Sequence, residues 1–222
     1  MDKLLLWVLV FTSLLSDAFA QTGKRFSDHV KLIPHLEKPL QSFHCVFQPI
    51  VTFPALKVFF SYHVRGRDNE LVIHKEKVGE YHLHIEHSKV KARGMEEFPS
   101  PVHFCASWES SSGIAEFGVK GKPWVEKGLQ RGYTVKGKPS IVLGQEQHTY
   151  GGGFAMSQSF VGVWGFVHVG LSTDSKRYLS VYQGSTLNPN VLDWGALNYE
   201  VNGYIVIKPR VWGKDLATTK IS

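Results

Sequence analysis

The stretch ELVIHKEKVGEYHLHIE, residues 70–86, contains two short runs of alternating apolar and polar side chains around Gly79. Because successive side chains of a strand point to opposite faces, this alternation predicts an antiparallel hairpin. One face is apolar and is expected in the core: Leu71, Ile73, Tyr81, Leu83 and Ile85. The other face carries His74, Glu76, His82, His84 and Glu86. A turn centred on Gly79 predicts that His74 and His84 lie opposite each other across the pair.

The polar face of this hairpin has two interpretations. Imidazole and carboxylate groups gathered on one face of a sheet can bind a transition metal. Antiparallel sheets also commonly leave one face in water, and polar side chains there need no ligand. Both interpretations stay open.

Strand patterns dominate the rest of the chain. Short runs rich in β-branched and aromatic residues, such as PVHFCASW (101–108) and FVGVWGFVHV (160–169), alternate with turn residues. Many short strands at this spacing predict a single all-β domain, a sandwich or a barrel. One helix is expected from Thr173 to Gln183, with a capping residue at its start and Gly184 at its end. The polar segment 213–222 is expected to be a flexible tail.

The first 20 residues predict a secretory signal peptide. Lys3 precedes an apolar run from Leu4, and the small residues of Ala18-Phe19-Ala20 suit cleavage. No later segment is long and apolar enough to span a membrane. The mature chain, residues 21–222, is therefore expected to be secreted. Its two cysteines, Cys45 and Cys105, then predict one disulfide.

Charge and motifs exclude several classes of function. The formal net charge is +6, but the basic residues are scattered and form no stripe with interleaved aromatic residues, so nucleic acid is not indicated. The chain lacks a Gly-x-Ser-x-Gly elbow, a His-Glu-x-x-His motif, a Walker loop and a dinucleotide fingerprint. An enzyme is therefore not expected.

The segment HFCASWES, residues 103–110, fits the pattern His-x-Cys-x-Ser-Trp-x-Ser and resembles the signature of the pentraxin family. Further segments at 66–70, 143–147, 157–162 and 192–201 resemble pentraxin segments in the same order. The resemblance runs from about residue 27 to residue 212. It implies a two-sheet antiparallel jelly-roll sandwich, lectin-like, with one helix on one face, and a disc of five subunits. It also implies a calcium site that binds phosphocholine, phosphoethanolamine or acidic sugars.

The resemblance places calcium ligands in this chain. They are Asp68, Asn69, Glu146, Gln147 (through its backbone carbonyl) and Gln158, with His148 in the same loop. Where the family has an acidic residue, this chain has His148 and Ala155. Calcium binds six to eight oxygens, several of them carboxylates. The family expectation is two ions per subunit, but the two lost carboxylates predict a weak first site and essentially no second site.

The positions that contact the ligand in related pentraxins correspond to His74 and His84. With His148 expected nearby, a three-histidine arrangement indicates a transition-metal site as an alternative to calcium. A further alternative is a vestigial secreted protein that binds no ligand. The family reads Phe-x-x-Cys where this chain has Phe43-His44-Cys45, so the disulfide with Cys105 needs a bulge or local shift. Residues 21–26 are also too short to contain the family's first strand.

Overall fold

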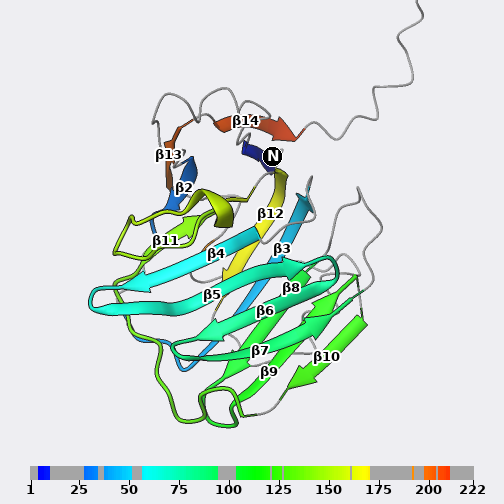
Figure 1. The fold of residues 1–222 in the computed structure, drawn as a ribbon, viewed down its shortest axis with the longest axis vertical. Coiled ribbons are helices and arrows are strands. Elements are labelled where there is room, and N and C mark those ends of the chain that lie inside the picture. The colour runs from blue at the N-terminus through cyan, green and yellow to red at the C-terminus, as the bar shows by residue number, and fades with distance from the viewer. Residues whose placement is uncertain are drawn as a thin grey trace, which may run out of the picture.

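The computed structural model describes residues 5–10, 28–34, 38–51, 57–94, 104–120, 122–126, 128–160, 162–170, 192, 198–203 and 205–210. Within these residues the chain forms two antiparallel β-sheets that lie one over the other, as Figure 1 shows. A single 3-10 turn, η2 (Met156–Gln158), is the only helical element in the described part. The expected helix at 173–183 and the tail at 213–222 lie outside the described residues.

Among the described residues, each sheet contains seven strands. The first has the spatial order β10 (Lys122–Glu126), β9 (Ile114–Val119), β8 (Phe104–Glu109), β3 (Ser42–Val51), β12 (Gly162–Gly170), β1 (Leu5–Val10) and β14 (Ile205–Arg210). The second has the order β13 (Tyr199–Asn202), β2 (His29–Leu32), β11 (Ser140–Leu143), β4 (Lys57–Val64), β5 (Arg67–Lys77), β6 (Glu80–Ile85) and β7 (Ser88–Arg93). Neighbours such as β3 and β12 are distant in sequence, so long connections cross between strands. The all-β prediction is confirmed, and the architecture is a sandwich.

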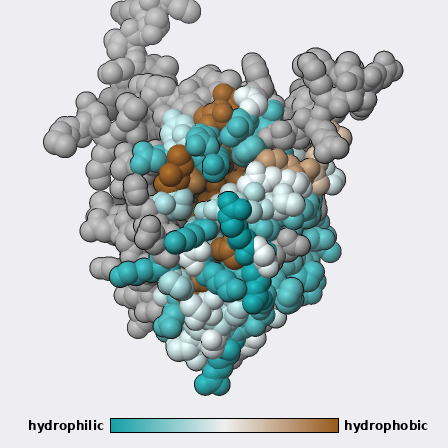
Figure 2. All heavy atoms as spheres, turned by 90° about the vertical axis from the view of Figure 1, so that its left-hand side faces the viewer, coloured by the Kyte–Doolittle hydropathy of each residue, from teal (hydrophilic) through white to brown (hydrophobic). Residues whose placement is uncertain are grey.

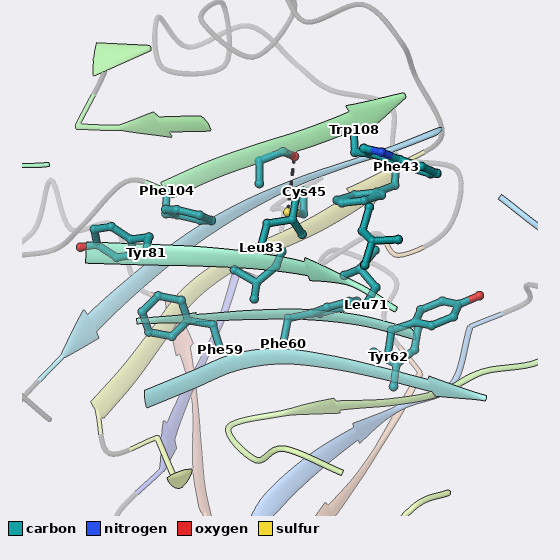
Figure 3. Packing of buried hydrophobic residues seen from close by; sticks show 14 of the residues in the cluster. Phe43, Cys45, Phe59, Phe60, Tyr62, Leu71, Tyr81, Leu83, Phe104 and Trp108 are labelled. Carbon is teal, nitrogen blue, oxygen red and sulfur yellow. Dashed lines mark hydrogen bonds between the residues drawn. The ribbon is translucent and has the colours of Figure 1, made fainter. Parts of the chain in front are cut away.

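The core lies between the two sheets, where apolar side chains of both inner faces meet. Figure 3 shows Tyr81 and Phe59 of the second sheet beside Phe104 of the first. The ring centroids of Tyr81 and Phe104 are 5.0 Å apart, and Phe59 packs edge-on against Phe160 at 5.8 Å. Aromatic pairs at these distances contribute beyond the area that they bury.

The hairpin of β5 and β6 faces the core as predicted: Leu71, Ile73, Tyr81, Leu83 and Ile85 all belong to the core cluster. The predicted pairing was wrong, because His74 lies opposite His82, and His84 lies opposite Val72. A bulge between Lys75 and Lys77 makes Glu76 an extra residue and shifts the pairing by one position. The other position comes from the turn, which is formed by Val78 and Gly79 and is not centred on Gly79.

A buried carboxylate joins the hairpin to the connection after β10. Glu70 is fully buried and accepts hydrogen bonds from the Tyr133 hydroxyl at 2.8 Å and from the Lys136 backbone N–H at 2.7 Å. Burial and the Glu70 carboxylate raise the pKa of Tyr133, so the phenol stays protonated and donates. The pair of bonds holds this connection against β5.

Replacing Glu70 with Gln is expected to lower the free energy of unfolding by roughly 1.5 kcal/mol. The amide keeps one acceptor, but it loses the charge and leaves one buried donor poorly matched. Urea unfolding followed by fluorescence measures the change. Glu116→Gln is the matched control, because Glu116 is half-buried and accepts only a 3.4 Å bond from Ser107. Equal losses in the two variants would contradict the role of Glu70.

The two cysteines lie on neighbouring strands but one position out of register. Cys45 of β3 pairs with Ala106, whereas Cys105 of β8 pairs with Val46. Cys45 points into the core, and its thiol donates to the Ala106 carbonyl at 3.5 Å (Figure 3). Cys105 faces away from the core, beside Gly118. Because a one-residue shift turns a strand side chain to the other face, the thiols point in opposite directions.

Both cysteines are free in the structure, so the predicted disulfide is not formed there. Burial raises the pKa of Cys45 well above its ordinary value and that of Cys105 to about 12. Both therefore stay as thiols, the unreactive form, at neutral pH.

Part of the predicted signal peptide is a strand in the structure. β1 pairs with β12 on one side and with β14 on the other, so that Val8 lies opposite both Trp164 and Ile207. A strand before β2 is therefore present at Leu5–Val10, whereas residues 21–26 lie outside the described residues. The signal peptide stays a prediction, and removal of residues 1–20 would take this strand out of the sheet.

On the side that Figure 2 presents, the coloured surface is mainly hydrophilic. Figure 2 shows small hydrophobic areas between mostly hydrophilic side chains on the side that it presents. The exposed large apolar residues of the described part are scattered along the sequence: Ile33, Val78, Tyr150, Met156 and Val201. No helix among the described residues is long and apolar enough to cross a membrane.

Candidate calcium loop and histidine cluster

The glycine-rich segment that follows β11 packs on the outer face of β4. Gln147 is fully buried, and its amide nitrogen donates to the backbone carbonyls of Ser61 and Ser140, each at 3.0 Å. The Gln147 side-chain oxygen accepts from the Gly151 backbone N–H at 3.0 Å. These bonds fix the loop on the sheet, and the buried Gln147 side chain is its anchor.

Two of the predicted calcium ligands, Glu146 and Gln158, meet in this loop together with His148. The Gln158 amide nitrogen donates to a Glu146 carboxylate oxygen, and the Gln158 oxygen lies 2.9 Å from His148 Nε2. Glu146 and Gln158 are half-buried, and His148 is exposed. The side chains thus form a chain of hydrogen bonds, Glu146–Gln158–His148, around the place where the family expectation puts a metal.

Asn69 of β5 fits a calcium ligand on a separate observation. Its backbone has a φ of 52°, and its side-chain oxygen Oδ1 is buried without a hydrogen-bond partner. Buried oxygens normally have a partner, and carbonyl-type oxygens are common calcium ligands. Asp68 lies in the same strand, and its side chain is outside the described part. Ala155 is half-buried and has no oxygen on its side chain.

A second group of polar side chains lies on the same outer face, on β5 and β6. His74, His82 and His84 each offer a ring nitrogen, and these three atoms lie within 4.8 Å of one another. His74 and His82 are buried, and His84 is partly buried. Glu76 reaches His74, and Glu80 reaches His82, through side-chain contacts of 3.0 and 2.9 Å.

The predicted three-histidine arrangement is thus partly correct. His74 and His84 do lie together, with ring centroids 4.9 Å apart. The third member among the described residues is His82, while His148 bonds to Gln158 in the calcium loop. The alternation in the sequence predicted correctly that His82 lies on the polar face of the hairpin. Because the predicted pairing register was wrong, the contact between His82 and His74 was not predicted.

The described chain is thus a lectin-like β-sandwich that gathers side-chain oxygen and nitrogen atoms on one outer face. A model described as the Pentaxin family matches residues 18–209, and the chain belongs to this family. It is 60% identical to serum amyloid P-component of Mus musculus, over 96% of this chain and 100% of that protein. It is 53% identical to serum amyloid P-component of Homo sapiens, with the same shares covered.

A solved structure has the same fold. The native heptameric SAP-like pentraxin of Limulus polyphemus superimposes with a TM-score of 0.80 and covers 94% of this chain and 97% of its own. Its sequence identity is 16%, so the likeness concerns the fold alone.

Proposed function

We propose that this pentraxin is a secreted, calcium-dependent pattern-recognition protein that binds ligands and catalyses no reaction. Its ligands are phosphocholine or phosphoethanolamine groups, or acidic sugars. The family membership and the similarity to serum amyloid P-component support a binding role. A bound calcium ion would supply positive charge for phosphate or carboxylate oxygens of the ligand.

The observation that carries the proposal is the buried, unpartnered Oδ1 of Asn69. Leaving a polar atom without a partner costs about 1–3 kcal/mol, and a cation at this position would remove that cost. Asp68, Glu146 and the Gln147 carbonyl complete the proposed first site.

The calcium affinity is proposed to be low, with one ion per subunit. The second site would retain only Glu146 and Gln158, because His148 and Ala155 offer no carboxylate. In the first site, Glu146 already accepts a hydrogen bond from Gln158. A calcium ion would have to compete with this hydrogen bond for the Glu146 carboxylate. Its positive charge would also be balanced by fewer carboxylates than the family pattern supplies.

The proposed assembly is a ring of identical subunits, five by the family expectation. The SAP-like pentraxin from Limulus polyphemus is heptameric, which supports a ring but leaves the number to experiment. The mass of the secreted protein by size-exclusion chromatography with light scattering measures it.

Retention on a phosphoethanolamine resin tests the function. Protein secreted from cells that express the full chain should bind in calcium and elute when calcium is chelated. Glu146→Gln should lose most of the retention, because it removes a carboxylate from the proposed site. Glu116→Gln, on the other sheet, is the matched control and should bind as the natural chain does. A folded oligomer that ignores calcium on phosphoethanolamine, phosphocholine and acidic-sugar resins would refute the proposal and favour a vestigial protein.

A further inference from the structure

We infer that His74, His82 and His84, with Glu76 as the fourth ligand, form a binding site for a divalent transition metal ion of the zinc type. The site lies on the hairpin of β5 and β6 and does not use the calcium loop. It rests on the geometry of these four side chains, so it stands whether or not calcium binds.

The positions of the rings suit one ion. The centroid of His74 is 4.9 Å from those of both His82 and His84, and the ring nitrogens lie within 4.8 Å of one another. Two nitrogens bound to one tetrahedral Zn²⁺ are about 3.4 Å apart. The rings therefore need to close by about 1.4 Å at most, which small side-chain rotations can supply.

Two of the ring nitrogens lack any other use. His82 Nδ1 and His84 Nε2 are buried and have no hydrogen-bond partner. Buried polar atoms of this kind are uncommon because they lose water without replacement. A metal ion between the rings would satisfy both nitrogens at once.

Two nearby carboxylates, Glu76 and Glu80, lie where a zinc site would use them. One Glu76 oxygen is 3.0 Å from His74 Nε2 and 4.0 Å from His82 Nδ1, so it lies beside both rings. Glu80 accepts from His82 Nε2 at 2.9 Å and thereby leaves Nδ1 of that ring for the ion. A carboxylate that orients a ligating histidine in this way is a common feature of zinc sites.

The protonation state also suits metal binding at neutral pH. Burial lowers the pKa of His84 to about 4, helped by the positive charge of Lys89, and burial also lowers the pKa of His74. Both rings are therefore neutral at pH 7, the form that binds a metal. Lys77 and Arg93 lie 3.6 and 3.5 Å from Glu80, so the unpaired negative charge for the ion comes from Glu76.

The site differs from the calcium loop in its chemistry, and it lies two strands away from the point where the loop is anchored on β4. Gln147 of the loop contacts Ser61 of β4, which pairs with Val72, which in turn pairs with His84. Two strand spacings, about 10 Å, therefore separate Ser61 from His84. Calcium prefers oxygen ligands, whereas three imidazoles favour zinc, copper or nickel.

Calorimetric titration of the secreted protein with Zn²⁺, in the presence of calcium, tests the site. We expect one zinc ion per chain, and a loss of at least tenfold in affinity for His84→Ala. His87→Ala is the matched control: His87 is exposed just after β6 and should not affect binding. Glu76→Gln changes a half-exposed position of the site and should also weaken zinc binding. Circular dichroism checks that each variant is folded.

Cobalt gives a readout of the ligand set. Co²⁺ in place of Zn²⁺ should give the visible absorption of a tetrahedral site, and His84→Ala should remove it. Two further variants separate this site from the calcium loop: His148→Ala and Glu146→Gln should both bind zinc as the natural chain does. The inference is overturned if the folded natural chain binds no zinc, if His84→Ala binds as tightly as His87→Ala, or if calcium or His148→Ala abolishes binding.

Discussion

The double variant Cys45→Val, Val46→Cys is expected to form a disulfide with Cys105 and to stabilise the protein by about 4 kcal/mol. Val46 lies directly opposite Cys105 across β3 and β8, and both are buried on the same face of the sheet. Side chains in this relation have Cβ atoms about 4.5–5.5 Å apart, close to the distance that a disulfide needs. The new bond would close a loop of about 60 residues, which accounts for the size of the effect.

Thiol titration of the unfolded protein and urea unfolding measure this outcome. The natural chain should show two free thiols, and the double variant none. Cys45→Val alone is the control: it should show one thiol and nearly unchanged stability, because valine resembles cysteine in size. A reducing agent should remove the gain of the double variant and leave the natural chain unaffected. A natural chain without free thiols would contradict the observed register.

The fold could be predicted from the sequence because its main signal is local. Alternation along residues 70–86 identified the core face of the hairpin, since side-chain direction in a strand depends only on position. The pairing register could not be predicted in the same way. It depends on the bulge at Glu76, and no residue there marks a bulge as clearly as a glycine would.

For the candidate site, too, the sequence predicted which residues belong together but not their contacts across strands. The resemblance predicted the loop residues Glu146, His148 and Gln158, and the structure brings their side chains together. The unpartnered oxygen of Asn69 and the closeness of His82 to His74 could not be predicted, because both depend on contacts across strands. The offset of Cys45 was visible in the sequence, but its consequence depended on whether β3 would absorb it with a bulge. The structure pairs β3 with β8 continuously there, so the offset remains.

The double variant His148→Asp, Ala155→Asp is expected to raise calcium affinity by about a hundredfold and to change the stoichiometry from one ion per chain to two. Each substitution adds a carboxylate where the family has an acidic residue. The aspartate at 148 also removes the His148–Gln158 contact, so that Gln158 can leave Glu146 and turn to an ion. Calorimetric titration of the secreted protein with calcium gives both the affinity and the number of ions.

The single variants separate charge from position. His148→Asp alone should strengthen the first site by about tenfold, because one carboxylate joins Glu146 and Asn69. Lys122→Gln makes the same change in net charge at an exposed position of β10, an edge strand of the first sheet, and it should have little effect in physiological salt because screening weakens charges beyond about 8 Å. If Lys122→Gln matched His148→Asp, net charge alone would explain the gain and the loop would not be the site. If the natural chain already bound two ions tightly, the lost carboxylates would not matter, and the weak calcium site proposed for this pentraxin would be wrong.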